Sequence, residues 1–241
     1  MKSNYRYIVK AFMAMAVIAG TTSCDDFLDR EPMSSISPET YYSTAAQLEA
    51  NLNDEYPNVL PSFGQWTYGI FGEDKGTDNQ IEVNANDRYT QDRWKVPHSE
   101  SDNWKFERIY RINFFLSEAL PKFGEDMSGS QNTISGSVAT IKHYIGEMYF
   151  LRAYEYFKKL QLFGDFPIIN QPLADEMEAL REASKRFPRN EVARFIISDL
   201  DKAYAYMSDV DMATTRINKD AAMLVKSRVA LFEATWLQNF K

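Results

Sequence analysis

One apolar segment, residues 138–163, constrains the fold of this chain more than any other feature. Its apolar side chains recur every three to four positions, which is the spacing of one face of an α-helix. That face carries Val138, Ile141, Ile145, Tyr149, Ala153, Phe157 and Leu160, with Met148, Leu151 and Phe163 beside it. A surface this wide must be covered by more than one neighbour. The segment therefore predicts a buried helix, which we expect to end at Gly164, with Pro167 following.

A shorter helix is predicted upstream of this segment. Thr44 and Gln47 have the spacing of a capping box, so we expect a helix over residues 45–56 that stops near Pro57. Residues 57–103 then combine prolines, glycines and aromatic residues without helical or strand periodicity. This stretch is too aromatic for a plain linker, and we expect a long ordered loop or a set of short pieces.

Three further helices are expected from their apolar periodicity. The first covers residues 102–120, and its apolar stripe contains one amide, Asn113. The second covers residues 190–207, with Asn190 as its N-cap, and the third covers residues 219–237. No convincing strand pattern appears after the aromatic stretch.

These patterns together predict an all-α fold of TPR-like stacked helical hairpins with long irregular loops, one of them over residues 164–188. Small residues at Gly146, Ala153 and Ala222 suit positions where two helices approach closely. The full sequence signature of the TPR repeat is absent. A hydrophobic content of 44% and an aromatic content of 14% are enough for one sizeable core.

The N-terminus has the composition of a secretory leader. Basic residues precede the apolar run 11–20, which is too short to span the roughly 30 Å of bilayer hydrocarbon. Cys24 follows and is the only cysteine. The alternative is an ordinary thiol in a folded domain, but acylation explains a lone cysteine here better. We expect residues 1–23 to be a lipoprotein signal peptide and Cys24 to carry the lipid, although Thr21 departs from the usual aliphatic residue of a lipobox.

Net charge limits the partners of the mature protein. Removal of the leader takes away three positive charges, so the formal net charge changes from -7 to -10. An acidic chain lacks the basic stripe that phosphate neutralisation needs, which argues against nucleic acid. Residues 24–40 are acidic and then rich in serine and proline, and we expect them to form a tether. Composition alone leaves open whether such a tether merely solubilises the terminus or directs the lipoprotein to the outer face of a membrane.

Several segments, taken in their order along the chain, make it resemble the SusD/RagB-type outer-membrane nutrient-binding lipoproteins of Bacteroidetes. The strongest block is GEMYFLRA at 146–153, closed by FGDFP at 163–167. The other segments are CDDFLD at 24–29, Trp104 with YRINFFL at 110–116, DLDKA at 199–203, RINKDAA at 216–222 and KSR at 226–228. The resemblance covers almost the whole chain after Cys24, with Met148 and Phe163 as small departures from the family pattern.

The resemblance implies a helical, TPR-like body, lipid-anchored in the outer membrane. In this family the body caps a SusC-type TonB-dependent transporter, to which it delivers a captured oligosaccharide or other nutrient. Family members normally continue well beyond this length, so we expect residues 41–241 to be the N-terminal part of a longer SusD-like helical domain. We expect the protein to be exposed on the cell surface, with periplasmic retention as the alternative.

The family-like block at 146–153 is a tempting site, but a structural role fits its residues better. Arg152 lies among apolar helix positions, so we expect it to pair with a carboxylate such as Asp199 or to cap a carbonyl. Asn113, on its apolar stripe, is expected to be a buried amide with its hydrogen bonds made.

No catalytic, metal or cofactor site can be assembled from the sequence. Glycoside hydrolysis needs two facing carboxylates, yet Asp199 and Asp201 point to different faces of their helix. His98 and His143 lack metal-ligand spacing, and no nucleophile elbow or glycine-rich phosphate loop occurs. We therefore expect a protein that is not an enzyme and holds no cofactor.

Aromatic residues in the stretch 57–103 are the candidate ligand contacts. Sugar rings stack their C–H faces on aromatic side chains while polar groups bind the hydroxyls. Tyr89, Arg93 and Trp94 lie close together in sequence, and Trp66 is a further candidate. The competing interpretation is that Tyr89 and Trp94 simply pin a long loop to the body. A glycan-capturing transporter subunit is thus the expected function, with a TPR-like envelope scaffold that binds proteins as the alternative.

Overall fold

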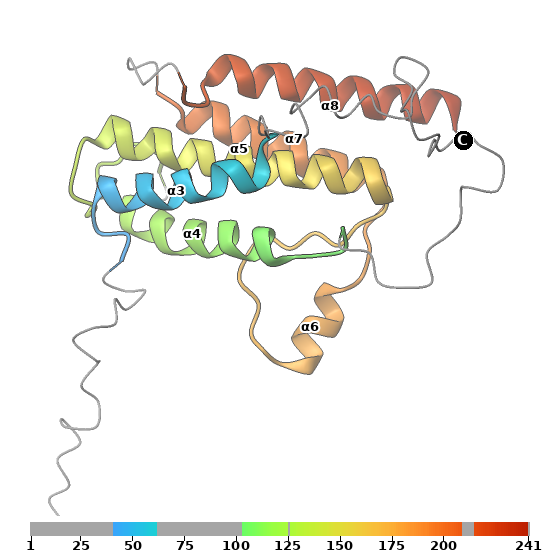
Figure 1. Ribbon diagram of the computed structural model, residues 1–241, viewed down its shortest axis with the longest axis horizontal. Coiled ribbons are helices and arrows are strands. Elements are labelled where there is room, and N and C mark those ends of the chain that lie inside the picture. The colour runs from blue at the N-terminus through green and yellow to red at the C-terminus, as the bar shows by residue number, and fades with distance from the viewer. Residues whose placement is uncertain (1–40, 62–102, 125, 209–214, 241) are drawn as a thin grey trace, which may run out of the picture. The chain divides into compact units, whose positions relative to one another are not determined.

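The computed structural model describes residues 41–61, 103–124, 126–208 and 215–240, all within one compact unit, Pro38–Lys241. Within these ranges the chain is helical, and no strand is formed beyond two isolated bridges. The helices are α3 (Ala45–Val59), α4 (Glu107–Phe123), α5 (Val138–Phe163), α6 (Met177–Ala183), α7 (Arg189–Tyr206) and α8 (Lys219–Asn239) (Figure 1).

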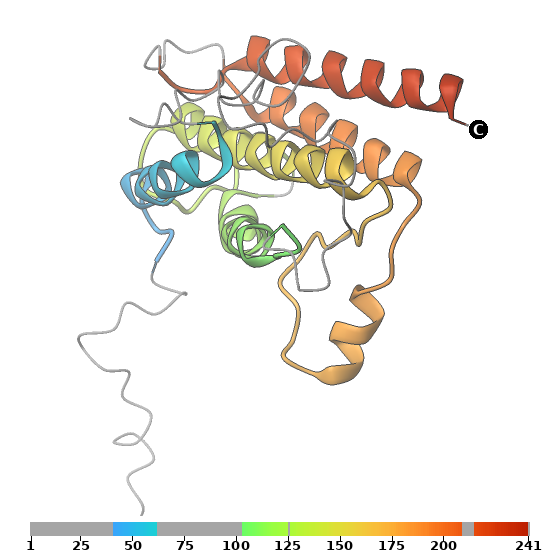
Figure 2. The same cartoon turned by 45° about the vertical axis from the view of Figure 1, so that its right-hand side comes forward.

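Helix α5 is the centre of the stack. It packs against α3, α4 and α7, and α7 carries α8 on its other side. Consecutive long helices run in opposite directions, so α4, α5, α7 and α8 form a series of antiparallel pairs (Figures 1 and 2). This arrangement confirms the predicted all-α architecture of stacked helical hairpins.

The apolar surface of α5 explains its central position. The helix begins and ends as predicted, at Val138 and at Phe163, and Gly164 follows with a φ of 69° that favours glycine. Side chains on all sides of its middle turns are buried, among them Ile145, Met148 and Leu151. Because no single neighbour can cover such a helix, the stack needs α3, α4 and α7 together.

Gly146 sets the distance between α5 and the end of α7. A Cβ atom at this position would lie 2.8 Å from the backbone nitrogen of Met207 and 2.9 Å from the carbonyl oxygen of Ala203. The two backbones therefore approach more closely than any larger residue allows. The close-approach role predicted for Gly146 is confirmed.

The first described helix extends further than predicted. Thr44 and Gln47 form the predicted capping box, with the Thr44 hydroxyl accepting from the Gln47 amide. Helix α3 nevertheless continues through Pro57 to Val59, although the proline removes one helical hydrogen bond. Val59 is buried, and the Leu60 amide donates to the Tyr56 carbonyl at 2.9 Å.

Helix α4 begins later than the predicted residue 102 and ends at Phe123 rather than 120. Its entry segment is held by ring contacts instead of helical hydrogen bonds. The Trp104 ring packs edge-on against Phe163 and Phe166, with ring centres 4.8 and 4.9 Å apart. At the other end, the buried Phe123 ring extends the helix by one turn before Gly124.

The predicted loop 164–188 is only partly irregular, because it contains the short helix α6. A bridge between Phe166 and Phe187 closes the base of this excursion, and α6 buries none of its residues (Figures 1 and 2). The prediction of Asn190 as N-cap is wrong. Pro188 is the N-cap, and the Asp165 carboxylate accepts from the Arg189 amide at 2.9 Å in place of a local cap.

Helix α8 covers α7 with one side and presents large apolar side chains on the other. Asn218 caps it by accepting from the Ala221 amide at 2.9 Å. Leu224 and Leu231 are 72% and 67% exposed, and Trp236 is partly exposed nearby. None of the described helices is both long enough and apolar enough to cross a membrane.

Candidate functional site

The predicted ligand contacts Trp66, Tyr89, Arg93 and Trp94 lie outside the described residues, as does the predicted lipidation site Cys24. They stay predictions. The described part of the chain contains two buried polar networks and a charged pocket as candidate sites.

The first network confirms the structural interpretation of the family-like block. Arg152 on α5 donates from Nε to Asp199 Oδ2 at 2.6 Å and from Nη2 to Asp199 Oδ1 at 2.8 Å. Its remaining nitrogen donates to the Asn113 side-chain oxygen at 2.8 Å, while the Asn113 amide donates to the Ile169 carbonyl at 2.9 Å. Three helices and the segment after α5 are thereby joined.

Burial and the charge of Asp199 shift the pKa of Arg152 in opposite directions. Burial lowers the pKa of Arg152, but the hydrogen bonds and negative charge of Asp199 outweigh it and raise the pKa overall. Both side chains are almost fully buried, and Tyr149 and Phe195 flank the guanidinium at 5.2 and 5.3 Å from their ring centres. With its donors occupied and rings on its faces, Arg152 holds helices together and does not reach a ligand.

The second network ties the entry of α8 to α3 and α5. Arg216 donates to both carboxylate oxygens of Glu147, at 2.8 and 2.6 Å, and the Tyr56 hydroxyl donates to the same carboxylate at 2.8 Å. The Ile217 amide donates to the Tyr56 hydroxyl at 3.1 Å. Glu147 is completely buried, so this cluster is also a structural tie.

His143 belongs to this second network and not to a metal site. Its Nδ1 accepts from the Ser208 amide at 3.3 Å, which leaves the proton on Nε2. Nε2 lies 3.0 Å from both the Ile217 carbonyl and a Glu147 carboxylate oxygen. Across the described ranges, no group of three or more histidine, cysteine or acidic residues could hold a metal ion.

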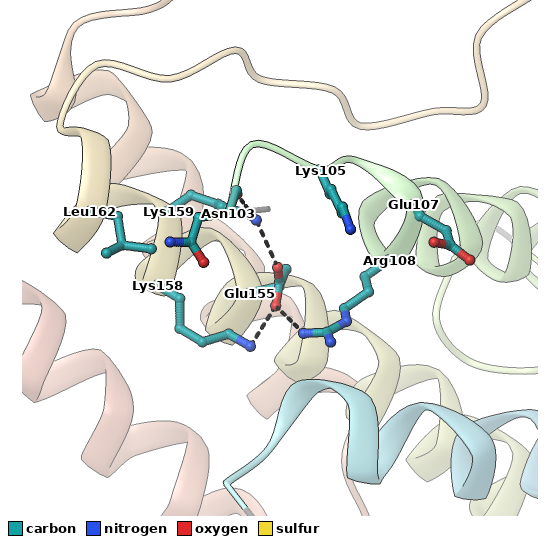
Figure 3. Close-up of a pocket in the computed structure, with 8 residues that line it drawn as sticks. All are labelled: Asn103, Lys105, Glu107, Arg108, Glu155, Lys158, Lys159 and Leu162. Carbon is teal, nitrogen blue, oxygen red and sulfur yellow. Dashed lines mark hydrogen bonds and ion pairs between the residues drawn. The ribbon is translucent and has the colours of Figure 1, made fainter. Parts of the chain in front are cut away.

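A solvent-accessible pocket of about 380 Å³ lies where the start of α4 meets the last turns of α5 (Figure 3). We call it the basic pocket. Its lining residues are Asn103, Lys105, Glu107, Arg108, Glu155, Lys158, Lys159 and Leu162. Four are basic and two are acidic, which gives the lining a formal charge of +2.

Glu155 is the organising residue of the basic pocket. It is 3% exposed, and Lys158 and Lys159 place their ammonium groups 2.6 and 3.3 Å from its carboxylate oxygens. Arg108 points at the same carboxylate from α4, at 3.9 Å (Figure 3). The buried charge is therefore surrounded by three cations.

Backbone carbonyls fix the two lysines further. Lys158 Nζ donates to the Val59 carbonyl at the end of α3 at 2.9 Å, and Lys159 Nζ donates to the Asn103 carbonyl at 2.7 Å. This pocket was not predicted from the sequence. The spacing of Glu155 from Lys158 and Lys159 is a visible helical pattern, but it is typical of an ordinary solvated helix face.

A second, smaller pocket of about 250 Å³ lies between the start of α4 and the α6 excursion. Its lining is mostly apolar and includes Phe106, Ile109, Tyr110, Ile169 and Leu180. It brings no charged pair or hydrogen-bonding cluster to one point, so the basic pocket is the better candidate for a chemically specific ligand.

Comparison with known proteins identifies the family. The SusD-like family model described as "Starch-binding associating with outer membrane" matches residues 26–231. The chain belongs to the SusD-like family. The resemblance seen in the segments from 24–29 to 226–228 is thereby confirmed.

Curated SusD-like relatives are longer than this chain. The SusD-like proteins P25 and P2 of Formosa agariphila are 25% and 26% identical over 233 and 238 residues. These matches cover 89% and 94% of this chain but only 41% and 43% of the relatives. The chain thus spans less than half the length of the relatives it matches.

Solved SusD-like structures share the fold. A SusD-like protein of Bacteroides fragilis superposes with a TM-score of 0.53 at 20% identity, covering 86% of this chain and 38% of that protein. A SusD-like carbohydrate binding protein of the same species gives 0.55 at 18% identity, with 82% and 39% covered. At these identities the likeness concerns the fold alone, and it agrees with the helical stack described above.

Proposed function

We propose that this chain belongs to a surface lipoprotein that binds a glycan and delivers it to a partner TonB-dependent outer-membrane transporter. The observation that carries the proposal is the family match over residues 26–231, in a family described as starch-binding and outer-membrane-associated. Because the chain spans only part of its relatives, binding and delivery are proposed for the whole protein.

The helical stack supports a role in binding and presentation rather than in chemistry. The buried ion pairs of Arg152 and Arg216 join helices, and the buried carboxylate of the basic pocket, Glu155, is paired with Lys158 and Lys159. We therefore propose that the protein releases no sugar by itself. Incubation of the purified full-length protein with polysaccharides should yield no new reducing ends, and their appearance would refute this part.

We propose Trp66, Tyr89, Arg93 and Trp94 as glycan contacts, since stacked rings and a flanking guanidinium suit a sugar. A glycan array on the full-length protein should first identify a ligand. Calorimetry should then show that Tyr89→Ala or Trp94→Ala costs roughly 1 to 3 kcal/mol of affinity. Unchanged affinity in both variants, at unchanged melting temperature, would remove this segment from the site.

We propose that a lipid on Cys24 anchors the protein in the outer membrane, facing the exterior. Cys24→Ser should leave the protein soluble and unprocessed, and antibody labelling of intact cells should be lost. A variant that still fractionates with the outer membrane and labels intact cells would contradict the anchor. Co-purification of a TonB-dependent transporter from detergent extracts of cells with the intact anchor tests the partner. Co-purification of soluble envelope proteins instead would favour the scaffold alternative.

A further inference from the structure

We propose that the basic pocket binds an acidic sugar unit, one that carries a carboxylate or a sulfate group. The inference rests on the proposed glycan-binding function and deepens it by naming the chemical class of the ligand. It is carried by the convergence of Lys105, Arg108, Lys158 and Lys159 on one accessible pocket (Figure 3).

The charge of the pocket is opposite to that of the chain. The whole sequence has a formal net charge of -7, yet the lining of this pocket sums to +2. A concave surface with an excess of one sign of charge attracts ligands of the opposite sign. A neutral glycan gains nothing from this arrangement, whereas an anionic one does.

Glu155 holds the lysines of the pocket in fixed positions, and the lining keeps a net positive charge despite this carboxylate. Glu155 forms ion pairs with Lys158 and Lys159, and each lysine also donates a hydrogen bond to one backbone carbonyl. An ammonium group has three donors, so these described partners account for two on each lysine. The lysines are thus held in place before a ligand arrives, which lowers the entropic cost of ordering them on binding.

Arg108 is the expected direct contact with the anion. Its side chain is 47% exposed, and its 3.9 Å separation from Glu155 is an ion pair without a hydrogen bond. No hydrogen bond within the described part of the chain engages its guanidinium, which can grip a carboxylate or sulfate with two parallel N–H donors. Lys105, just upstream of the same helix, adds a second positive charge at the rim.

A purely structural role accounts for only half of these cations. Lys158 and Lys159 have a structural role, because each donates from its ammonium group to a backbone carbonyl of another segment, that of Val59 or of Asn103. The helix dipole does not explain the position of Arg108, since Arg108 lies in the first turn of α4, where positive charge is unfavourable. The volume of about 380 Å³ lies within the range of small-molecule sites, about 300 to 1,000 Å³.

Matched charged and neutral sugars test the proposal. Calorimetry on the full-length protein would use trigalacturonate and its methyl ester, then a sulfated carrageenan oligosaccharide and its desulfated form. We expect each charged sugar to bind at least about tenfold more tightly than its neutral counterpart, since a hydrogen bond to a charged group is stronger than one between neutral groups. Arg108→Gln should remove most of that preference. Arg194→Gln, which makes the same charge change at an exposed position of α7, should leave it intact.

Separate outcomes distinguish failure of this inference from failure of the proposed function. Equal affinity for charged and neutral sugars, unaffected by Arg108→Gln, would overturn the inference and leave glycan binding standing. Binding of inorganic sulfate without binding of any sugar would overturn both. A third outcome concerns Arg108 itself. If Arg108→Gln weakens the binding of charged and neutral sugars equally, or lowers the melting temperature as it weakens binding, Arg108 has a structural role in the pocket. That result would overturn its role as the anion contact.

Discussion

Arg152 and Asp199 lie side by side in the core, joined by two parallel hydrogen bonds of 2.6 and 2.8 Å. One comes from α5 and the other from α7, so this pair spans the largest helix interface of the stack. A buried pair of this kind adds little net free energy of folding, because both charges lose their hydration. Removal of one partner is nevertheless very costly, because the other charge then stays buried without compensation.

Asp199→Ala should therefore destabilise the fold by about 3 to 5 kcal/mol, as it leaves a buried guanidinium without its carboxylate. Denaturant unfolding followed by circular dichroism measures the change. Asp201→Ala is the matched control, because Asp201 is exposed and forms a surface ion pair with Lys226; it should cost about 1 kcal/mol or less. Equal losses in the two variants would contradict the structural role of the buried pair.

Gly146→Ala should cost roughly 1 to 3 kcal/mol even though alanine is the better helix former, because the new Cβ meets the α7 backbone at 2.8 Å. Relief requires movement of the end of α7 rather than of a flexible side chain. Hydrogen exchange should accordingly speed up around Ala203 and Met207 before it does in α4. A stabilised Gly146→Ala variant would show that the two helices are not in close contact.

The Glu55 carboxylate makes stability depend on pH. Burial raises its pKa above the ordinary value, and the positive charge of Arg111 opposes this only in part. The folded chain therefore holds this proton more tightly than the unfolded chain does, so the contribution of Glu55 to stability decreases as pH rises past the ordinary glutamate pKa.

Glu55→Gln keeps a neutral side chain at every pH. Its stability should match that of the unaltered protein at acidic pH and exceed it at neutral pH, with the difference growing between the two. Thermal unfolding at a series of pH values measures this difference. A Glu55→Gln variant that becomes less stable than the unaltered protein as pH rises would mean that the Arg111 ion pair outweighs burial.

The exposed apolar residues of α8 should make the chain associate with itself. Leu224→Glu combined with Leu231→Glu should reduce association in sedimentation velocity, because both side chains are largely exposed. The free energy of unfolding should change by only about 0.5 kcal/mol per site, as for other surface substitutions. Ala222→Glu, on the buried side of the same helix, should unfold the protein instead. Unaltered association in the double variant would assign the contact to another surface.

Short-range patterns were sufficient for much of the fold. The bounds of α5, the Thr44 capping box and the stacking of helices follow from apolar periodicity and cap chemistry, which depend on residues a few positions apart. The same periodicity placed Arg152 and Asn113 among apolar positions, and a buried polar group requires a partner. Their structural role was therefore predictable.

Features that join distant segments became visible only in three dimensions. Asp165 replaces the local cap predicted at Asn190 because the bridge between Phe166 and Phe187 brings it to the start of α7. Likewise, Arg108 meets Glu155 only because α4 and α5 pack antiparallel, with the start of one beside the end of the other. Periodicity predicts which face of a helix is buried, but not which end of another helix lies beside it, and the basic pocket exists at such a meeting point.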